Sequence, residues 1–127
     1  MHPAESLLIV CLCAEWCGTC REYRAAFEEL RRALPGHRWR WLDVEDEAEL
    51  AGDIDIETFP SLLIARGAEV LFAGPVLPRA AEGQRLVSAI VEALQTGRRP
   101  APLVLLPEQL EAFGALARRL DAEAAGG

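Results

Sequence analysis

The chain of 127 residues is 51% hydrophobic and 26% charged, a balance typical of a single soluble globular domain. Its formal net charge of −7 argues against nucleic acid as a partner, and its 13 basic residues are all arginine, which excludes Schiff-base chemistry. No stretch approaches the ~20 apolar residues of a membrane-spanning helix, and no basic patch typical of a signal peptide precedes the first apolar run. We therefore expect a cytoplasmic protein without a membrane partner, whose cysteines are kept reduced.

A buried strand and an amphipathic helix are predicted at the start of the chain. The strand is the apolar run of residues 7–12. Apolar residues then recur at three- and four-residue steps, which is the stripe of a helix: Cys20, Tyr23, Phe27, Leu30 and Leu34. Pro35 should end this helix, because the residue before a proline resists the helical conformation. Residues 39–44 should form a second strand, parallel to the first after the helical crossover.

Acidic residues are dense after this second strand. They are Asp43, Glu45, Asp46, Glu47, Glu49, Asp53, Asp55 and Glu57. A short helix is expected around residues 47–51. The favoured interpretation of the acidic run is a solvated face of the protein. The alternative is a patch beside an active site that selects protein partners by their charge.

A hairpin and two further helices are expected in the rest of the chain. Pro60 heads an apolar run that ends at residue 65, which fits the first residue of a strand. A turn at residues 66–68 leads to an antiparallel strand over residues 69–73, which Gly74 and Pro75 should break. A helix follows over residues 79–94, with an apolar face of Leu86, Val87, Ile90, Val91 and Leu94.

The C-terminal segment is predicted to be a linker followed by a helix. Residues 96–102 are rich in glycine, arginine and proline, Pro107 can open a helix, and residues 124–127 should fray. The apolar surface of the segment comprises residues 103–106 and the helix face Leu110, Phe113, Ala117 and Leu120. We assign residues 1–95 to one domain and expect residues 96–127 to pack on its sheet. Homodimer formation through this segment is the alternative.

Cys17 and Cys20 form a Cys-x-x-Cys motif at the junction between the first strand and the first helix. The first turn of a helix offers unpaired backbone N–H groups and the positive end of the helix dipole, which together favour a thiolate. We therefore predict that Cys17, beside Trp16, is an exposed nucleophile. Cys20, one helical turn further on, should be more buried and close enough to form a disulfide with it.

The spacing of Cys-x-x-Cys also occurs in zinc sites, but a zinc site needs a second pair of ligands. No cysteine follows Cys20 and His37 stands alone, so we predict no metal and give His37 no role. Upstream, Cys11 and Cys13 are interpreted as small buried hydrophobic residues. Their i, i+2 spacing on a strand places them about 6.6 Å apart, which is long for an unstrained disulfide. A redox role for Cys11 as a third thiol is the alternative.

Several separated motifs resemble those of the thioredoxin family, in the order in which that family carries them. Residues 14–20, Ala-Glu-Trp-Cys-Gly-Thr-Cys, are close to its active-site signature. Residues 59–63, Phe-Pro-Ser-Leu-Leu, are similar to its cis-proline segment, and residues 67–70, Gly-Ala-Glu-Val, to its hairpin. The resemblance covers about residues 7–94. It implies an α/β, thioredoxin-like fold with a four-stranded mixed sheet flanked by helices, to which this chain adds a C-terminal helical segment.

The same resemblance implies roles for the site residues. Cys17 would be the attacking thiolate and Cys20 the resolving thiol, and no cofactor would be needed besides their redox-active disulfide. Pro60 would be cis and keep metal ions away from the thiols, while a substrate would pair with the backbone of Phe59 by strand addition. The residues expected to contact substrate are Trp16, Gly18, Thr19, Phe59 and Pro60.

Three positions depart from the family pattern. Cys11 stands where thioredoxins carry a buried aspartate that assists proton transfer, and Trp41 replaces the lysine that usually accompanies it. We therefore expect Cys20 to be deprotonated more slowly or through water. Thr19 replaces the proline between the two cysteines of typical thioredoxins. Small local changes of this kind retune a reduction potential, since about 30 mV corresponds to ~1.4 kcal/mol.

The predicted function is a thiol–disulfide oxidoreductase that reduces disulfides in protein substrates through a mixed disulfide at Cys17. An upstream reductant would regenerate it. The alternative is a thioredoxin-fold interaction module with little or no turnover, whose acidic surface or C-terminal helix binds a partner. The intact pair Cys17 and Cys20 favours the enzyme, whereas the lost aspartate–lysine pair and the extra C-terminal segment favour the module.

Overall fold

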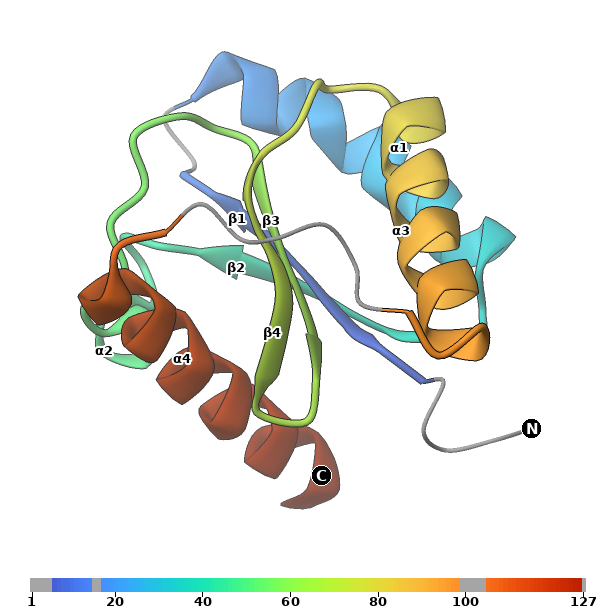
Figure 1. The fold of residues 1–127 in the computed structure, drawn as a ribbon. Coiled ribbons are helices and arrows are strands. Elements are labelled where there is room, and N and C mark those ends of the chain that lie inside the picture. Colours follow the sequence, from blue (N-terminus) through green and yellow to red (C-terminus); the bar gives the residue numbers. More distant parts are fainter. Residues whose placement is uncertain (1–5, 15–16, 99–104, 127) are drawn as a thin grey trace.

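The computed structural model describes residues 6–14, 17–98 and 105–126, and Figure 1 shows the arrangement of its elements. In chain order these are β1 (Leu8–Cys13), α1 (Gly18–Ala33), β2 (Arg38–Asp43), α2 (Ala48–Ala51), β3 (Ser61–Arg66), β4 (Glu69–Pro75), α3 (Ala80–Gln95) and α4 (Pro107–Gly126). The strands form one sheet in the order β2-β1-β3-β4, with β1 parallel to β2 and the other neighbours antiparallel. The expected mixed sheet with flanking helices and an additional C-terminal helix is confirmed.

Strand β1 lies in the interior of the sheet, and all six of its residues are buried. Successive side chains of a strand point to opposite faces, so β1 contributes to two separate hydrophobic clusters. One cluster, with α1 and α3, contains its residues Ile9, Cys11 and Cys13. The cluster on the other face contains Leu8, Val10 and Leu12. The alternation therefore directs two of the four cysteines toward helix α1.

Helices α1 and α3 lie side by side on one face of the sheet (Figure 1). The predicted stripe of α1 is confirmed, since Cys20, Tyr23, Phe27 and Leu30 are its buried residues. Helix α3 packs against the same cluster through Val87 and Ile90. At Gly83 the two helices approach closely, because a Cβ atom there would lie 2.8 Å from Cδ1 of Leu30.

Helix α4 covers the opposite face of the sheet (Figure 1). Its residues Phe113, Leu116, Ala117 and Leu120 are buried in the cluster that contains Leu8, Val10 and Leu12 of β1. Ion pairs tie the same helix to β2: Arg38 with Asp121 at 2.7 Å and Arg40 with Glu123 at 2.9 Å. These contacts place α4 on the sheet of its own chain, and the proposed division at residue 95 stays a prediction.

Two polar side chains of α4 hold the loop between α2 and β3. Gln109 accepts a hydrogen bond from the backbone N–H of Asp55 at 2.8 Å and donates to the carbonyl of Asp53 at 3.2 Å. Arg119 donates to the carbonyl of Leu50 at 2.8 Å. Its guanidinium passes over Gly52, whose φ of +70° favours glycine; a Cβ there would lie 2.6 Å from Nη2 of Arg119, so the guanidinium would have to shift.

The apolar surface predicted for the C-terminal segment is only partly correct. Leu105 packs against the cluster, but Leu106 and Leu110 are 64% and 42% exposed. Leu110 lies in the first turn of α4 and does not belong to the buried cluster, to which Leu116 contributes instead. Residues 103 and 104, and most of the predicted linker, lie outside the described residues.

Two predicted boundaries are wrong for identifiable reasons. Strand β4 continues through Gly74 and Pro75, where the sequence predicted a break. This strand is at the edge of the sheet, where a proline without an N–H is tolerated. Helix α4 continues to Gly126 instead of fraying from residue 124, in keeping with the high helix propensity of the alanines in its last turn.

His37, to which the sequence gave no role, holds the start of β1. Its Nδ1 accepts a hydrogen bond from the backbone N–H of Leu7 at 3.1 Å, and burial lowers the pKa of His37 below its usual 6.5. Because folding favours the neutral imidazole, the stability it contributes should be complete above about pH 6.5 and should be lost as the pH falls through the lowered pKa.

We therefore expect His37→Asn to flatten the pH dependence of stability below about pH 6.5, because asparagine can accept the same hydrogen bond without titrating. Denaturant midpoints of both proteins, measured at intervals between roughly pH 7.5 and pH 5, test this expectation. Equal slopes in the wild type and the variant would contradict it.

Candidate active site at the strand-to-helix junction

The Cys-x-x-Cys motif lies where β1 passes into α1. Cys17 is the N-cap of α1: its N–H donates to the carbonyl of Ala14 at 3.0 Å, and its carbonyl accepts from the N–H of Arg21 at 3.2 Å. Its thiol is free and partly exposed. Gly18 is exposed and Thr19 half-buried, whereas Trp16, the other predicted contact residue here, lies outside the described residues.

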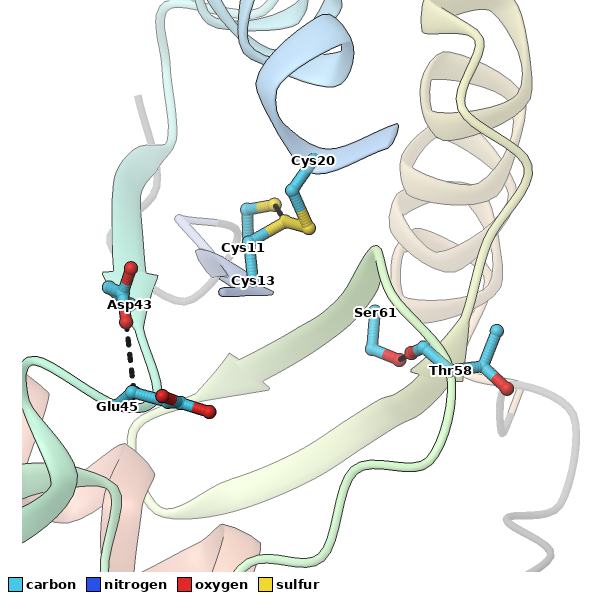
Figure 2. Close-up of a disulfide and its surroundings, with 7 residues drawn as sticks. All are labelled: Cys11, Cys13, Cys20, Asp43, Glu45, Thr58 and Ser61. Carbon is cyan, nitrogen blue, oxygen red and sulfur yellow. Dashed lines mark hydrogen bonds between the residues drawn. A yellow bond between two sulfur atoms is a disulfide. The ribbon is translucent and has the colours of Figure 1, made fainter. Parts of the chain in front are cut away.

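Cys20 forms a disulfide with Cys13, not with Cys17 (Figure 2). The Cα atoms of Cys13 and Cys20 are 5.8 Å apart, which is within the usual range for a disulfide. Cys13 is the last residue of β1 and points toward α1, where Cys20 lies on the buried side of the first turn. The interpretation of Cys13 as a simple hydrophobic residue is therefore wrong, and the expected pairing of Cys17 with Cys20 is absent from this structure.

Cys11 lies beneath this disulfide as a buried free thiol. Its Sγ is 3.5 Å from Sγ of Cys13, because both side chains leave the same face of β1 (Figure 2). Burial raises the pKa of Cys11 far above its ordinary value, and the positive charge of Arg24 opposes this shift. The thiol form of Cys11 is therefore favoured at neutral pH.

An aromatic and cationic wall flanks the buried cysteines. Trp41 of β2 stands opposite Cys11 in the strand register, and the guanidinium of Arg24 lies 4.7 Å from the centre of its ring. Arg24 is a positive group near Cys11 that the sequence did not single out, although it lies one turn after Cys20 on the same helix. Beside it, Tyr23 carries a buried hydroxyl without a hydrogen-bond partner among the described residues, and burial raises the pKa of Tyr23.

A cavity of about 630 Å³ opens next to Cys20. Its walls combine Cys20 with Arg21, Arg24, Trp41, Asp43 and Asp46. Three members of the acidic run, Asp43, Asp46 and Glu47, therefore line this cavity, and Glu47 also forms an ion pair with Arg40 at 2.8 Å. The remainder follows the solvated interpretation, since Glu45, Glu49, Asp53, Asp55 and Glu57 are exposed.

The segment of Phe59 and Pro60 precedes β3 at the same end of the sheet. The peptide bond between these residues is cis, Pro60 is buried, and Phe59 packs against the cluster that contains Cys11, Cys13 and Cys20. Strands β1 and β3 are antiparallel and Leu12 pairs with Ser61, so the segment just before Ser61 lies near the end of β1 at Cys13. The hydroxyl of Ser61 donates to the carbonyl of Thr58 at 2.7 Å (Figure 2).

Metal-binding and membrane-spanning features can be assessed for the described part of the chain. There, no group of three or more His, Cys, Asp or Glu side chains is placed to hold a metal ion. None of the helices in that part is both long and apolar enough to cross a membrane.

The family model for thioredoxin matches residues 1–95, which is most of the chain. The chain belongs to the thioredoxin family. A Streptomyces coelicolor protein described as a thioredoxin is 38% identical over 69 residues, which cover 54% of this chain and 52% of that protein. A rice protein described as thioredoxin H-type is 33% identical over 67 residues, covering 52% of this chain and 55% of that protein. The chain thus spans about half the length of the curated thioredoxins it matches.

Solved thioredoxin structures share the fold. The X-ray structure of Fasciola hepatica thioredoxin has a TM-score of 0.60 at 19% identity, covering 68% of this chain and 82% of that one. The crystal structure of chloroplastic thioredoxin z has a TM-score of 0.59 at 24% identity, covering 70% and 80%. At these identities the likeness concerns the thioredoxin fold alone.

Proposed function

We propose that the chain is a thiol–disulfide oxidoreductase that reduces disulfides in proteins, with Cys17 as the attacking and Cys20 as the resolving cysteine. One observation carries the proposal: among the four cysteines, only Cys17 is partly exposed, and it holds a free thiol at the start of a long helix. A substrate disulfide can therefore reach this sulfur, whereas the other three are buried. Membership of the thioredoxin family supports the same reaction class.

In the proposed reaction, the Cys17 thiolate attacks one sulfur of a substrate disulfide and releases the other sulfur as a thiolate. Cys20 then attacks the Cys17 sulfur of this mixed disulfide and releases the reduced substrate. Two electrons have passed to the substrate, and the protein is left with a disulfide. An upstream dithiol reductant returns it to the reduced form, and no further cofactor takes part.

The substrate would lie over the start of α1, where Cys17 is partly exposed. Gly18 and Thr19, together with Phe59 and Pro60, are the described residues that we propose to contact it. An extended substrate segment could pair with the backbone of Phe59, which lies just before the start of β3 at Ser61. We further propose that the protein acts in the cytoplasm, where reducing conditions suit a disulfide reductase.

Reduction of insulin by the full chain tests the proposal. With dithiothreitol as the electron donor, the protein should accelerate precipitation of the insulin B chain well above the rate with dithiothreitol alone. A Cys20→Ser variant should instead accumulate a mixed disulfide between Cys17 and the substrate, because the second step is blocked. A wild-type protein that leaves the rate unchanged would contradict the proposal.

The Cys13–Cys20 disulfide favours a second candidate function, an interaction module with little or no turnover. In this structure Cys20 is only 1% exposed and already bonded, as expected of a structural disulfide. The insulin assay separates the two functions, since a structural disulfide would give no catalysis. Among the described residues, Leu110 of α4 and Leu106 just before it would be the exposed apolar contacts offered to a partner.

Alkylation of the reduced protein should select Cys17. Cys11, Cys13 and Cys20 are buried, whereas Cys17 is partly exposed, so the reagent reaches its sulfur first. Limited treatment with iodoacetamide near pH 7, followed by peptide mass mapping, measures the order of modification. Modification of Cys11 or Cys20 before Cys17 would reverse the assigned roles.

A further inference from the structure

We propose that Cys13 is a third redox-active cysteine. It replaces Cys17 as the disulfide partner of Cys20, so that the oxidised protein holds a buried Cys13–Cys20 disulfide. This inference rests on the proposed reaction, whose product is the Cys17–Cys20 disulfide. It gives the oxidised protein two forms. In the form with the Cys13–Cys20 disulfide (Figure 2), Cys17 holds a free thiol.

The geometry gives the sulfur of Cys20 two partners. Cys17 precedes it by one helical turn at the N-cap of α1, and Cys13 bonds to it from the end of β1, with Cα atoms 5.8 Å apart. Cys13 can reach this position because β1 alternates its side chains and the last one points toward α1. Cys20 therefore has one candidate partner on its own helix and one at the end of β1.

The exchange is balanced within the protein. The Cys13 thiolate attacks Sγ of Cys20, a new S–S bond forms, and the bond between Cys20 and Cys17 breaks. The electron pair leaves with Cys17, and the proton lost by Cys13 passes to Cys17 or to solvent. One disulfide replaces another, so no external oxidant or reductant is consumed.

Burial and exposure both favour the product of this exchange. Cys13 and Cys20 are each 1% exposed, a site that suits an uncharged disulfide. The sulfur that departs is that of Cys17, which is partly exposed, so water can solvate or protonate it. Cys11 lies 3.5 Å from Cys13 without being bonded to it and serves as the matched control.

A protease that cuts after glutamate distinguishes the two disulfides. The chain has Glu5, Glu15 and Glu22, so cleavage separates residues 6–15, which hold Cys11 and Cys13, from residues 16–22, which hold Cys17 and Cys20. A Cys17–Cys20 disulfide stays within the second peptide. A Cys13–Cys20 disulfide links the two peptides and leaves Cys17 open to alkylation.

The experiment follows the reduced full-length protein after addition of oxidised glutathione, with acid quenching, alkylation of free thiols and digestion. The internal disulfide of residues 16–22 should appear first and then convert to the linked pair, with fragment masses that place the link at Cys13. Cys11→Ala should give the same sequence of products, and Cys13→Ala should stop at the internal disulfide. A linked pair that never forms, or that forms as fast in Cys17→Ala, would overturn the inference.

The reduction potential gives a second readout that a merely structural Cys13 would not move. An extra form of the oxidised state makes the wild type harder to reduce than Cys13→Ala. A tenfold preference for the buried disulfide would lower its potential by about 30 mV, and Cys11→Ala should show no such difference. Insulin reduction separates the two ideas: an inactive wild type contradicts the proposed function, whereas an active wild type without the linked peptides contradicts only the role of Cys13.

Discussion

Replacing Cys17 with serine should abolish insulin reduction, with a loss of roughly 10³-fold or more that reaches the rate of dithiothreitol alone. A serine hydroxyl is not ionised near neutral pH and cannot form a disulfide, so the mixed disulfide with substrate is lost. The remaining cysteines cannot take over, because all three are buried. Turbidity from the precipitating B chain measures the effect.

Cys11→Ala is the matched control for this experiment. It also removes one thiol from the same cluster, but that thiol is buried and held in its protonated form by burial. The control should keep most of the activity, after correction for any loss of folded protein. Residual turnover in Cys17→Ser, or an equal loss in Cys11→Ala, would contradict the assignment of Cys17 as the nucleophile.

Truncation of Leu116 to alanine should cause a large loss of stability. Its side chain is completely buried against the face of β1 that carries Leu8, Val10 and Leu12. Large-to-small substitutions at such sites cost ~2–5 kcal/mol, because transfer free energy is lost and a cavity remains. Urea denaturation, with the midpoint and slope fitted separately, measures the loss.

Leu110→Ala in the same helix is the control for packing. This side chain is 42% exposed, so its truncation should change the free energy of unfolding by no more than about 0.5 kcal/mol. Both variants carry the same chemical change and almost the same helix propensity. Equal destabilisation by the two substitutions would mean that α4 is not held by its contact with the sheet.

The elements of the fold were predictable because local patterns specify them. The predicted strand of residues 7–12 corresponds to the fully buried β1 (Leu8–Cys13), shifted by one residue, and the stripe from Cys20 to Leu30 has the period of a helix. Leu110 was misassigned because helical spacing identifies an apolar face but does not say which of its side chains a neighbouring element covers. Such limits depend on tertiary packing, which a local pattern does not contain.

The candidate site shows the same division between local and tertiary information. The motif and the exposure of Cys17 follow from a helix start. The partner of Cys20 does not, because the position of Cys13 depends on how the end of β1 lies beneath the first turn of α1. His37 and Arg24 were overlooked for a related reason: their partners Leu7, Cys11 and Trp41 come from other segments.

The docking of α4 on β1 also affects the order in which the protein can mature. β1 is synthesised well before α4, the helix that covers its face of Leu8, Val10 and Leu12. Contacts between such distant segments form late, because a long chain must first be closed into a loop. In the nascent chain this apolar face of the sheet therefore stays uncovered until α4 has been made, and it is open to non-native contacts until then.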